Sequence, residues 1–196
     1  MDSRQHSAVF LDRDGTINIE KDYLVDPREF AFVPGAPEAI RALKRAGFLV
    51  VVVTNQSGIA RGYFNAAQVG RLHTYMQNQL QGYFTHVDAF YMCPHHPSAG
   101  NGPFTGACKC RKGKPGMLFE AARDLNIDLA TSYMVGDKAA DLEAGLGAGC
   151  HPVLVRTGYG NKTCDKPAVQ KWQKTERIAV CDDLPAAARY ILAQDG

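Results

Sequence analysis

The alternation of apolar runs with helix-forming segments along all 196 residues most constrains what this chain can fold into. Apolar, β-branched runs predict strands at 8–12, 48–55, 86–93, 132–137, 151–158 and 177–182. Apolar residues at helical spacing predict helices between them at 37–47, 65–82, 116–125, 138–149 and 183–194. This order predicts an α/β fold with a doubly wound, mainly parallel sheet, formed by a single domain over residues 1–196.

Local signals support several of these boundaries. The continuous run FLVVVVTN (48–55) is typical of a strand buried on both faces of a parallel sheet. Pro37 and Gly47 mark the start and the stop of one helix. Asn65 followed by Gln68 predicts a capping box at the start of another. Residues 159–176 are mostly polar and are interpreted as a polar surface excursion.

Charge and hydropathy exclude several classes of protein. The 22 basic and 20 acidic residues give a net charge of +2, which is not the basic excess that is typical of nucleic-acid-binding proteins. The longest apolar run, FLVVVV, is far shorter than the roughly 20 residues of a membrane span. The first seven residues are polar and no apolar segment of a signal peptide follows them, so a cytoplasmic protein is expected. No long apolar stripe is evident, which favours a monomer.

Polar residues gather where the predicted strands end. In doubly wound folds the ligand lies beyond the carboxyl ends of the strands. Those ends carry Asp12, Thr54 with Asn55, Cys93 and Asp137. All but Cys93 suit phosphate and metal chemistry, and Cys93 opens a cysteine-containing loop.

Asp12 and Asp14, in FLDRDGT (10–16), are two carboxylates placed where a strand ends and a turn begins. Such a pair is unfavourable unless a cation lies between the carboxylates, and Mg²⁺ prefers oxygen ligands. An aspartate can also attack phosphorus as a nucleophile, while a second carboxyl transfers protons. Gly15 allows the turn. The alternative is that D-x-D-G is only a turn sequence.

The other strand ends extend this pattern. The Thr54 hydroxyl and the backbone N–H groups that follow it suit a phosphoryl oxygen. Lys112, with Arg111 and Lys114 beside it, would supply positive charge to a transferring phosphoryl group. Asp137 would complete the Mg²⁺ ligands. The alternatives are an ordinary loop, solvated basic residues and a helix cap.

Asp137 opens the segment DKAAD, which contains two further charged residues. Lys138 is a candidate contact to substrate. Asp141 is a candidate second carboxylate that holds this loop in place.

Cys93, His95, Cys108 and Cys110 have the residue types and spacing of a closed tetrahedral zinc site. A closed site is structural, so we expect zinc to brace the loop of about 93–110 and thereby position Arg111 and Lys112. His96 is an alternative ligand to His95, and free or disulfide-bonded cysteine pairs are the alternative to zinc. Two readings, buried apolar side chains or surface thiols, remain for the other cysteines: Cys150, Cys164 and Cys181.

Taken together, the four strand-end motifs resemble those of the haloacid dehalogenase (HAD) superfamily of phosphatases. The matching segments are FLDRDGT, VVVTNQSG, the lysine of CRKGKPGM, and MVGDKAAD. Longer stretches resemble the D-glycero-D-manno-heptose 1,7-bisphosphate 7-phosphatase branch: FLDRDGTIN, VVVTNQSGIARG, YMCPHHP, CKCRK, PGML and SYMVGDK. The resemblance spans nearly the whole chain and implies a Rossmann-like fold. The short gaps between the motifs leave no room for a large cap domain.

The resemblance also implies roles for individual residues. Asp12 would be the nucleophile, Asp14 the general acid and base, and Thr54 and Lys112 the groups that steady the phosphoryl group. Mg²⁺ would be bound by Asp12, Asp137 and the backbone carbonyl of Asp14. The implied substrate-binding residues are Arg13, Glu20, Lys21, Asp22, Tyr23, Asn55, Gln56, Ser57, Arg111 and Lys138.

One motif departs from the branch. The branch pattern is R-K-P-x-P-G-M, whereas here Gly113 and Lys114 follow Lys112. Lys112 is our assignment for the phosphoryl-binding lysine, and Lys114 is the reserve.

The activity implied is Mg²⁺-dependent hydrolysis of the 7-phosphate of D-glycero-D-manno-heptose 1,7-bisphosphate through a phospho-aspartyl intermediate. Its product, heptose 1-phosphate, would serve the synthesis of ADP-heptose for the lipopolysaccharide core. A histidinol-phosphate phosphatase shares the same motifs and a similar zinc loop, and is the nearest alternative. A non-catalytic zinc-binding interaction module is an alternative of another class. The sequence does not distinguish the α from the β anomer of the sugar.

Overall fold

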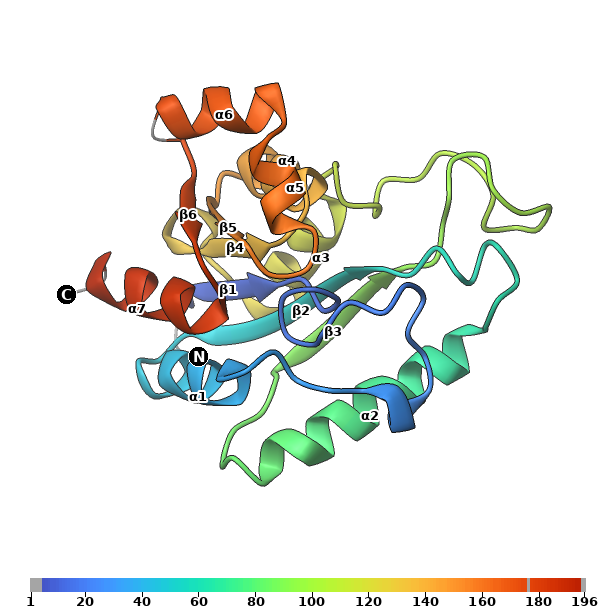
Figure 1. Ribbon diagram of the computed structural model, residues 1–196, viewed down its shortest axis with the longest axis horizontal. Helices are drawn as coiled ribbons and strands as arrows, with labels where there is room; N and C mark the ends of the chain where they lie inside the picture. Colours follow the sequence, from blue (N-terminus) through green and yellow to red (C-terminus); the bar gives the residue numbers. More distant parts are fainter. Residues whose placement is uncertain (1–4, 176, 195–196) are drawn as a thin grey trace.

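The computed structural model describes residues 5–175 and 177–194 of the chain. Within these ranges six strands form one parallel sheet, ordered β3-β2-β1-β4-β5-β6 (Figure 1). The strands are β1 (Ala8–Leu11), β2 (Leu49–Asn55), β3 (Ala89–Cys93), β4 (Tyr133–Gly136), β5 (His151–Val155) and β6 (Ala179–Cys181). The sheet confirms the doubly wound α/β prediction.

Helices cover both faces of the sheet. The α-helices are α1 (Ala36–Arg45), α2 (Ala66–Gln81), α3 (Gly116–Leu125), α4 (Ala139–Ala148), α5 (Gly160–Cys164), α6 (Pro167–Lys174) and α7 (Leu184–Gln194). Two short 3₁₀ helices are η1 (Pro27–Glu29) and η2 (Leu129–Thr131). Figure 1 shows α1 and α2 below the sheet and α4 above it; α7 packs on the same face as α1 and α2, and α3 on the same face as α4.

The core follows from the period-2 alternation of the strands. In β1, Val9 and Leu11 face a buried cluster that includes side chains of α1, α2 and α7. Phe10, between them, faces the opposite cluster with α3 and α4. Both faces of the central strands are therefore buried, as the continuous apolar run of β2 predicts.

Helix α2 begins at the predicted capping box. The side chain of Asn65 accepts a hydrogen bond from Gln68 N at 3.0 Å, and that of Gln68 accepts one from Asn65 N at 2.9 Å. Two N–H groups without a partner inside the helix are thus satisfied. Helix α1 contains Pro37 in its first turn, also as predicted.

The interpretation of residues 159–176 as a polar surface excursion is wrong for the part that packs against the core. It contains α5 and α6, and Val169 of α6 is fully buried against Leu142, Leu154 and Ile178. Pro167 in the first turn of α6 and the spacing of Val169 and Trp172 are helix signals that the polar composition of the segment hides. Glu176 lies outside the described residues.

The topology places the expected ligand site at the carboxyl ends of the two central strands, β1 and β4. From β1 the chain crosses to β2 on one side, and from β4 it crosses to β5 on the other side. A crevice opens where such crossovers diverge. Asp12 directly follows β1 and Asp137 directly follows β4, its neighbour in the sheet.

No separate cap domain stands over these strand ends in the described part of the chain. One short 3₁₀ helix lies between β1 and α1, and one helix between β2 and β3. No helix in the described ranges is both long and apolar enough to cross a membrane.

Candidate active site

A cavity of about 430 Å³ opens at the carboxyl ends of β1, β2 and β4. Most of the predicted catalytic and substrate-binding residues line it. The lining is Asp12, Asp14, Glu20, Asp22, Tyr23, Thr54, Asn55, Gln56, Ser57, Arg111, Lys112, Lys138, Ala140, Asp141 and Tyr159.

Lys112 is the buried cation of this cavity. Its Nζ lies 2.6 Å from Asp12 Oδ1 and 2.8 Å from Asp141 Oδ1, and it donates to Val53 O at 2.7 Å. Burial opposes the charged form, but the two carboxylates outweigh burial and raise the pKa of Lys112, so the side chain stays protonated.

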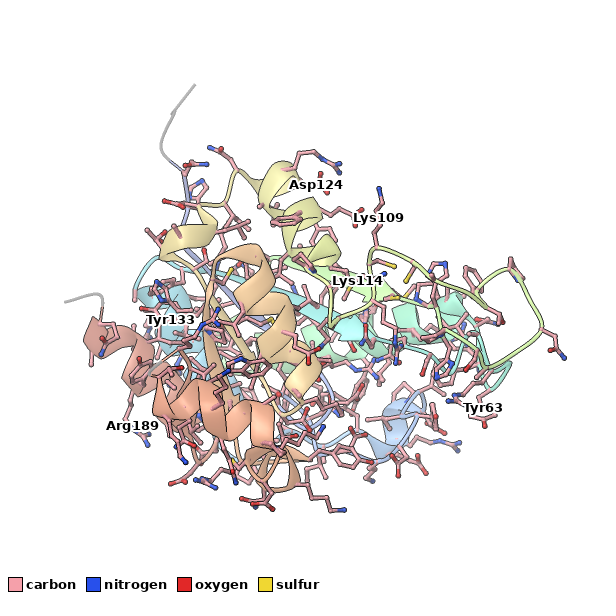
Figure 2. The ribbon with its side chains drawn as sticks, turned by 90° about the horizontal axis from the view of Figure 1, so that it is seen from above. Tyr63, Lys109, Lys114, Asp124, Tyr133 and Arg189 are labelled. Atoms are coloured by element: carbon pink, nitrogen blue, oxygen red, sulfur yellow. The ribbon has the colours of Figure 1, made fainter. Side chains whose placement is uncertain are left out.

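Lys114, the reserve assignment, lies elsewhere. It sits with Lys109 on the segment that follows Cys108 (Figure 2), and its Nζ donates to Cys108 O at 2.8 Å. Of the two lysines, the structure brings Lys112 to Asp12.

Asp12, Asp137 and Asp141 form a buried carboxylate cluster, with one oxygen of each within 4.8 Å of the others. Burial and the charge of Asp12 raise the pKa of Asp137 to about 7. Asp137 Oδ1 is buried without a hydrogen-bond partner, although Lys138 Nζ lies 3.5 Å away. An unpartnered carboxylate oxygen among other carboxylates fits a hard divalent cation.

The carboxylate of Asp14 is not part of this cluster. It accepts hydrogen bonds from Arg13 Nη2 at 2.9 Å, Asn18 Nδ2 at 3.1 Å and Gln56 Nε2 at 3.0 Å. Burial opposes ionisation, but Arg13 and these donors outweigh it and hold the pKa of Asp14 below its usual value. The metal role expected of Asp14 used its backbone carbonyl. Asp141, expected only to hold the loop, is the additional carboxylate of the cluster.

Two residues expected to bind substrate lie outside the cavity lining. Arg13 is fully buried behind Asp14, where its guanidinium donates to Asp14 and to Leu24 O at 3.1 Å. Lys21 is exposed and does not line the cavity. The reason is tertiary: Arg13 is needed to compensate the buried Asp14 charge, and the side chain of Lys21 is in solvent.

The residues at the carboxyl end of β2 and directly after it hold the other groups in place. Asn55 Oδ1 accepts from Lys112 N at 2.9 Å, which fixes the backbone that carries the buried lysine. Gln56 Nε2 donates to Thr54 Oγ1 at 2.8 Å as well as to Asp14. Gln56 N also donates to Cys93 O at 2.8 Å, so this loop is tied to the end of β3.

The loop of residues 20–23, hereafter the 20–23 loop, forms one wall of the cavity. Glu20 Oε2 accepts from Lys138 Nζ at 2.8 Å. Tyr159 completes this wall and was missed from the sequence. It follows β5, so the rule that ligands bind at strand ends could have singled it out.

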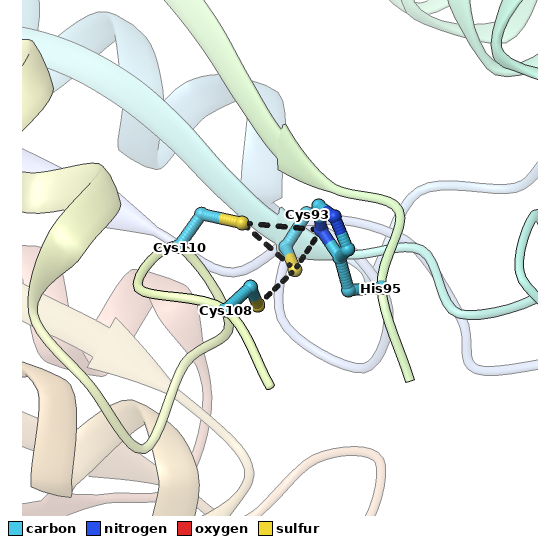
Figure 3. A group of neighbouring side chains, drawn as sticks. All are labelled: Cys93, His95, Cys108 and Cys110. Atoms are coloured by element: carbon cyan, nitrogen blue, oxygen red, sulfur yellow. Dashed lines mark hydrogen bonds between the residues drawn. The ribbon is translucent and has the colours of Figure 1, made fainter. Parts of the chain in front are cut away.

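Cys93, His95, Cys108 and Cys110 converge beside the cavity (Figure 3). Cys93 Sγ lies 3.6 Å from Cys108 Sγ and 3.2 Å from Cys110 Sγ, while His95 Nδ1 lies 3.5 Å from Cys110 Sγ. His96 is turned away, with its Nε2 3.1 Å from Arg61. All six cysteines lie in the described ranges and are free thiols. Three thiols and an imidazole this close fit a tetrahedral zinc ion.

A hydrogen bond links this cluster to the cavity. Arg111 Nη1 donates to His95 O at 3.0 Å, and the same arginine lines the cavity. In the sequence it stands between Cys110 of the cluster and the buried Lys112. Fixing the cluster therefore also fixes the two basic residues that follow it.

Comparisons with known proteins agree with this geometry. A HAD-hydrolase-like family model matches residues 109–187. The chain is 49% identical over 186 residues to the D-glycero-beta-D-manno-heptose-1,7-bisphosphate 7-phosphatase of Yersinia pestis, covering 93% of this chain and 96% of that one. It is 49% identical over 152 residues to the enzyme of the same name from Escherichia coli K12, covering 77% and 80%.

A solved structure is also similar. It is that of D,D-heptose 1,7-bisphosphate phosphatase from B. bronchiseptica, complexed with magnesium and phosphate. The TM-score is 0.82 at 41% sequence identity, and the match covers 96% of this chain and 99% of that one.

Proposed function

The chain belongs to the D-glycero-beta-D-manno-heptose-1,7-bisphosphate 7-phosphatase family of HAD-like hydrolases, and on that premise we propose its substrate, its metals and its catalytic residues. It is a phosphatase that removes the 7-phosphate of heptose 1,7-bisphosphate and leaves heptose 1-phosphate, a step toward the lipopolysaccharide core. The names of the relatives specify the β anomer, which we expect to be preferred. This family membership favours the heptose substrate over histidinol phosphate.

The position of Asp12 carries the proposal. Asp12 directly follows β1, and its carboxylate lines the cavity 2.6 Å from the buried ammonium group of Lys112. An Asp12 oxygen attacks phosphorus, the bond to the sugar oxygen breaks, and Asp14 protonates that leaving oxygen. Asp14 then takes a proton from water, which attacks phosphorus and releases phosphate and free Asp12.

Lys112 and Thr54 steady the phosphoryl group during both transfers, because Lys112 keeps its positive charge beside Asp12. Asp14 is ionised while it is bound to Arg13. The first transfer needs the protonated acid, so we expect Asp14 to turn from Arg13 toward the cavity when it acts.

Mg²⁺ would be held by Asp12, Asp137 and the Asp14 backbone carbonyl, with Asp141 close by, and would neutralise charge on the phosphoryl oxygens. The buried, unpartnered oxygen of Asp137 supports this assignment. Zn²⁺ would be held by Cys93, His95, Cys108 and Cys110 and would have a structural role.

The substrate is tested by phosphate release, with Mg²⁺ present, from both anomers of the heptose bisphosphate and from histidinol phosphate. We expect the β anomer to give the largest kcat/KM. A larger value for histidinol phosphate would overturn the substrate, and would leave the nucleophile untouched.

The nucleophile is tested separately with Asp12→Asn. We expect kcat to fall by roughly four orders of magnitude or more, since loss of one member of a catalytic set removes most of the rate enhancement. Circular dichroism should show an unchanged fold. An active, folded variant would overturn the phospho-aspartyl mechanism.

A further inference from the structure

We propose that Tyr159 is a positioning residue that clamps the 20–23 loop over the cavity and so sets specificity for the sugar part of a phosphorylated substrate. The substrate class rests on the proposed function above. The clamp itself rests on contacts that Tyr159 makes at three points.

The phenol group reaches the loop. Tyr159 Oη donates to Asp22 Oδ1 at 2.7 Å, joining two residues 137 positions apart in the sequence. This short bond to a carboxylate belongs to the stronger class of hydrogen bonds.

The ring reaches the loop a second time through Lys138. Lys138 Nζ lies 4.9 Å from the centroid of the Tyr159 ring, a cation–π distance, and donates to Glu20 Oε2 at 2.8 Å. Glu20 Oε1 in turn accepts from Asp22 N at 3.0 Å. Tyr159 thus holds both carboxylates of the loop, Asp22 directly and Glu20 through the lysine.

The backbone anchors this arrangement to the catalytic frame. Tyr159 N donates to Asp137 Oδ2 at 2.7 Å, and Asp137 directly follows β4. The clamp therefore runs from Asp137, at the carboxyl end of the sheet, through one tyrosine to the 20–23 loop, and Tyr159 lines the cavity together with that loop.

The loop needs such a clamp because its backbone is strained. Asp22 and Tyr23 are consecutive non-glycine residues with φ of 43° and 60°. Left-handed backbone is unfavourable for a residue such as Tyr23, and less so for an aspartate such as Asp22, and it persists where the surroundings impose it. The exposed side chain of Asp22 is bonded by Tyr159, while Tyr23 packs edge-on against Tyr63 with ring centroids 4.9 Å apart.

The held loop presents chemistry suited to a polyhydroxylated ligand. Glu20 and Asp22 offer carboxylate acceptors to hydroxyl groups, and Tyr23 and Tyr159 offer aromatic faces beside them. The reacting phosphoryl group instead meets Asp12 and Lys112, at the floor of the cavity. Loosening the loop should consequently affect recognition of the sugar more than phosphoryl transfer.

The test compares two substrates with Tyr159→Phe, which removes only the hydroxyl group. The KM for the heptose bisphosphate should rise about threefold to tenfold, the range for an ordinary hydrogen bond, because solvent around the exposed Asp22 weakens this charged one. The loss of kcat/KM should be at least threefold smaller for p-nitrophenyl phosphate, which has no sugar hydroxyls. Equal losses for the two substrates, or no loss for the heptose, would overturn the proposal.

A matched control removes the same kind of bond elsewhere. Tyr91 Oη donates to Asp124 Oδ2 at 3.1 Å, and Asp124 lies well apart from Tyr63, which packs against Tyr23 of the loop (Figure 2). Tyr91→Phe should leave the KM values for both substrates at their wild-type levels.

Asp22→Gly provides the second variant, because glycine suits the positive φ and removes the acceptor. The double variant with Tyr159→Phe should raise the KM for the heptose no further than the single variant with the larger effect. The reason is that both substitutions remove the same hydrogen bond between Tyr159 and Asp22. Additive effects would show that the two residues act separately and would overturn the clamp.

Amide hydrogen exchange tests the clamp without any substrate. A peptide covering the 20–23 loop should exchange about threefold to tenfold faster in Tyr159→Phe than in the wild-type protein or Tyr91→Phe. Unchanged exchange would overturn the clamp. If the wild-type protein hydrolyses only p-nitrophenyl phosphate, the substrate proposal fails, while the exchange result still decides the clamp.

Discussion

Lys112 illustrates how the site depends on single buried charges. Two carboxylates, those of Asp12 and Asp141, lie within 2.8 Å of its Nζ, and all three side chains are buried. Removing one partner from such a group leaves an uncompensated charge in the protein interior, where charges are poorly solvated.

We expect Lys112→Met to lower the free energy of unfolding by about 3–5 kcal/mol in the presence of EDTA. Urea denaturation measures this loss. Lys114→Met is the control, because Lys114 is exposed and its replacement should cost less than about 0.5 kcal/mol. Comparable losses in the two variants would contradict the buried position of Lys112.

His73 is a second residue whose burial has a measurable result. Its ring stacks on Phe90 with centroids 4.5 Å apart, and its Nε2 is buried without a hydrogen-bond partner. Burial, with a contribution from the charge of Arg13, lowers the pKa of His73 to about 3. In the unfolded chain the same group titrates near 6.5.

The unfolded state therefore binds one more proton than the folded state between about pH 6.5 and 3, so acid favours unfolding. Stability from neutral His73 is complete above pH 6.5 and is lost as the pH falls toward 3. His73→Phe should reduce the slope of unfolding free energy against pH by up to ~1.4 kcal/mol per pH unit in this window. Denaturation at pH 4, 5 and 6 tests this, and parallel slopes would contradict it.

At the scale of the elements, the loop between β3 and α3 contains no helix or named strand, and a cluster of cysteine and histidine side chains restrains it. It contains Cys108 and Cys110, which converge on Cys93 at the end of β3 and on His95. A loop of this length is expected to need an internal clip to keep one conformation.

Cys108→Ser removes one proposed zinc ligand. We expect zinc affinity to fall by more than the roughly 10–100-fold that loss of an outer hydrogen-bond partner costs. The melting temperature and kcat/KM should fall with it, because Arg111 is tied to the loop through His95 O. Elemental analysis and thermal denaturation measure this. Cys164→Ser, in α5, should keep its zinc, and a Cys108→Ser variant with full zinc, stability and activity would contradict the restraint.

At the scale of the whole molecule, the site exists because separate elements bring like charges together. Asp12 follows β1, Asp137 follows β4 and Asp141 lies in α4, yet their oxygens lie within 4.8 Å. The raised pKa of Asp137 reflects this repulsion as well as burial. A bound cation should therefore stabilise the fold as a whole.

We expect Mg²⁺ at about 100 times its Kd to add ~2.7 kcal/mol, a rise of roughly 5–10 °C in the melting temperature. Asp137→Asn should melt higher than the wild-type protein in EDTA, because it relieves the repulsion, and should lose the Mg²⁺ shift. Asp124→Asn, at an exposed surface aspartate, should keep it. A Mg²⁺ shift of wild-type size in Asp137→Asn would contradict the assignment.

The sequence by itself determined the order of the six strands and of helices α1 to α4 and α7, and the set of strand ends. Apolar runs, capping residues and the positions of Asp12, Thr54 and Asp137 are local signals, because a strand or a helix cap is defined by a few neighbouring residues. The weak signals failed where composition hid them, as in α5 and α6.

Only the tertiary structure decided which way side chains point. The sequence favoured Lys112 and His95 and left Lys114 and His96 as alternatives. The structure brought Lys112 to Asp12 and placed His95 among the cysteines. It also put Arg13 behind Asp14 and brought Tyr159 across to Asp22. These choices depend on packing between segments far apart in the chain and on compensation of buried charge. Neither leaves a repeating pattern of apolar and polar residues from which it could be predicted.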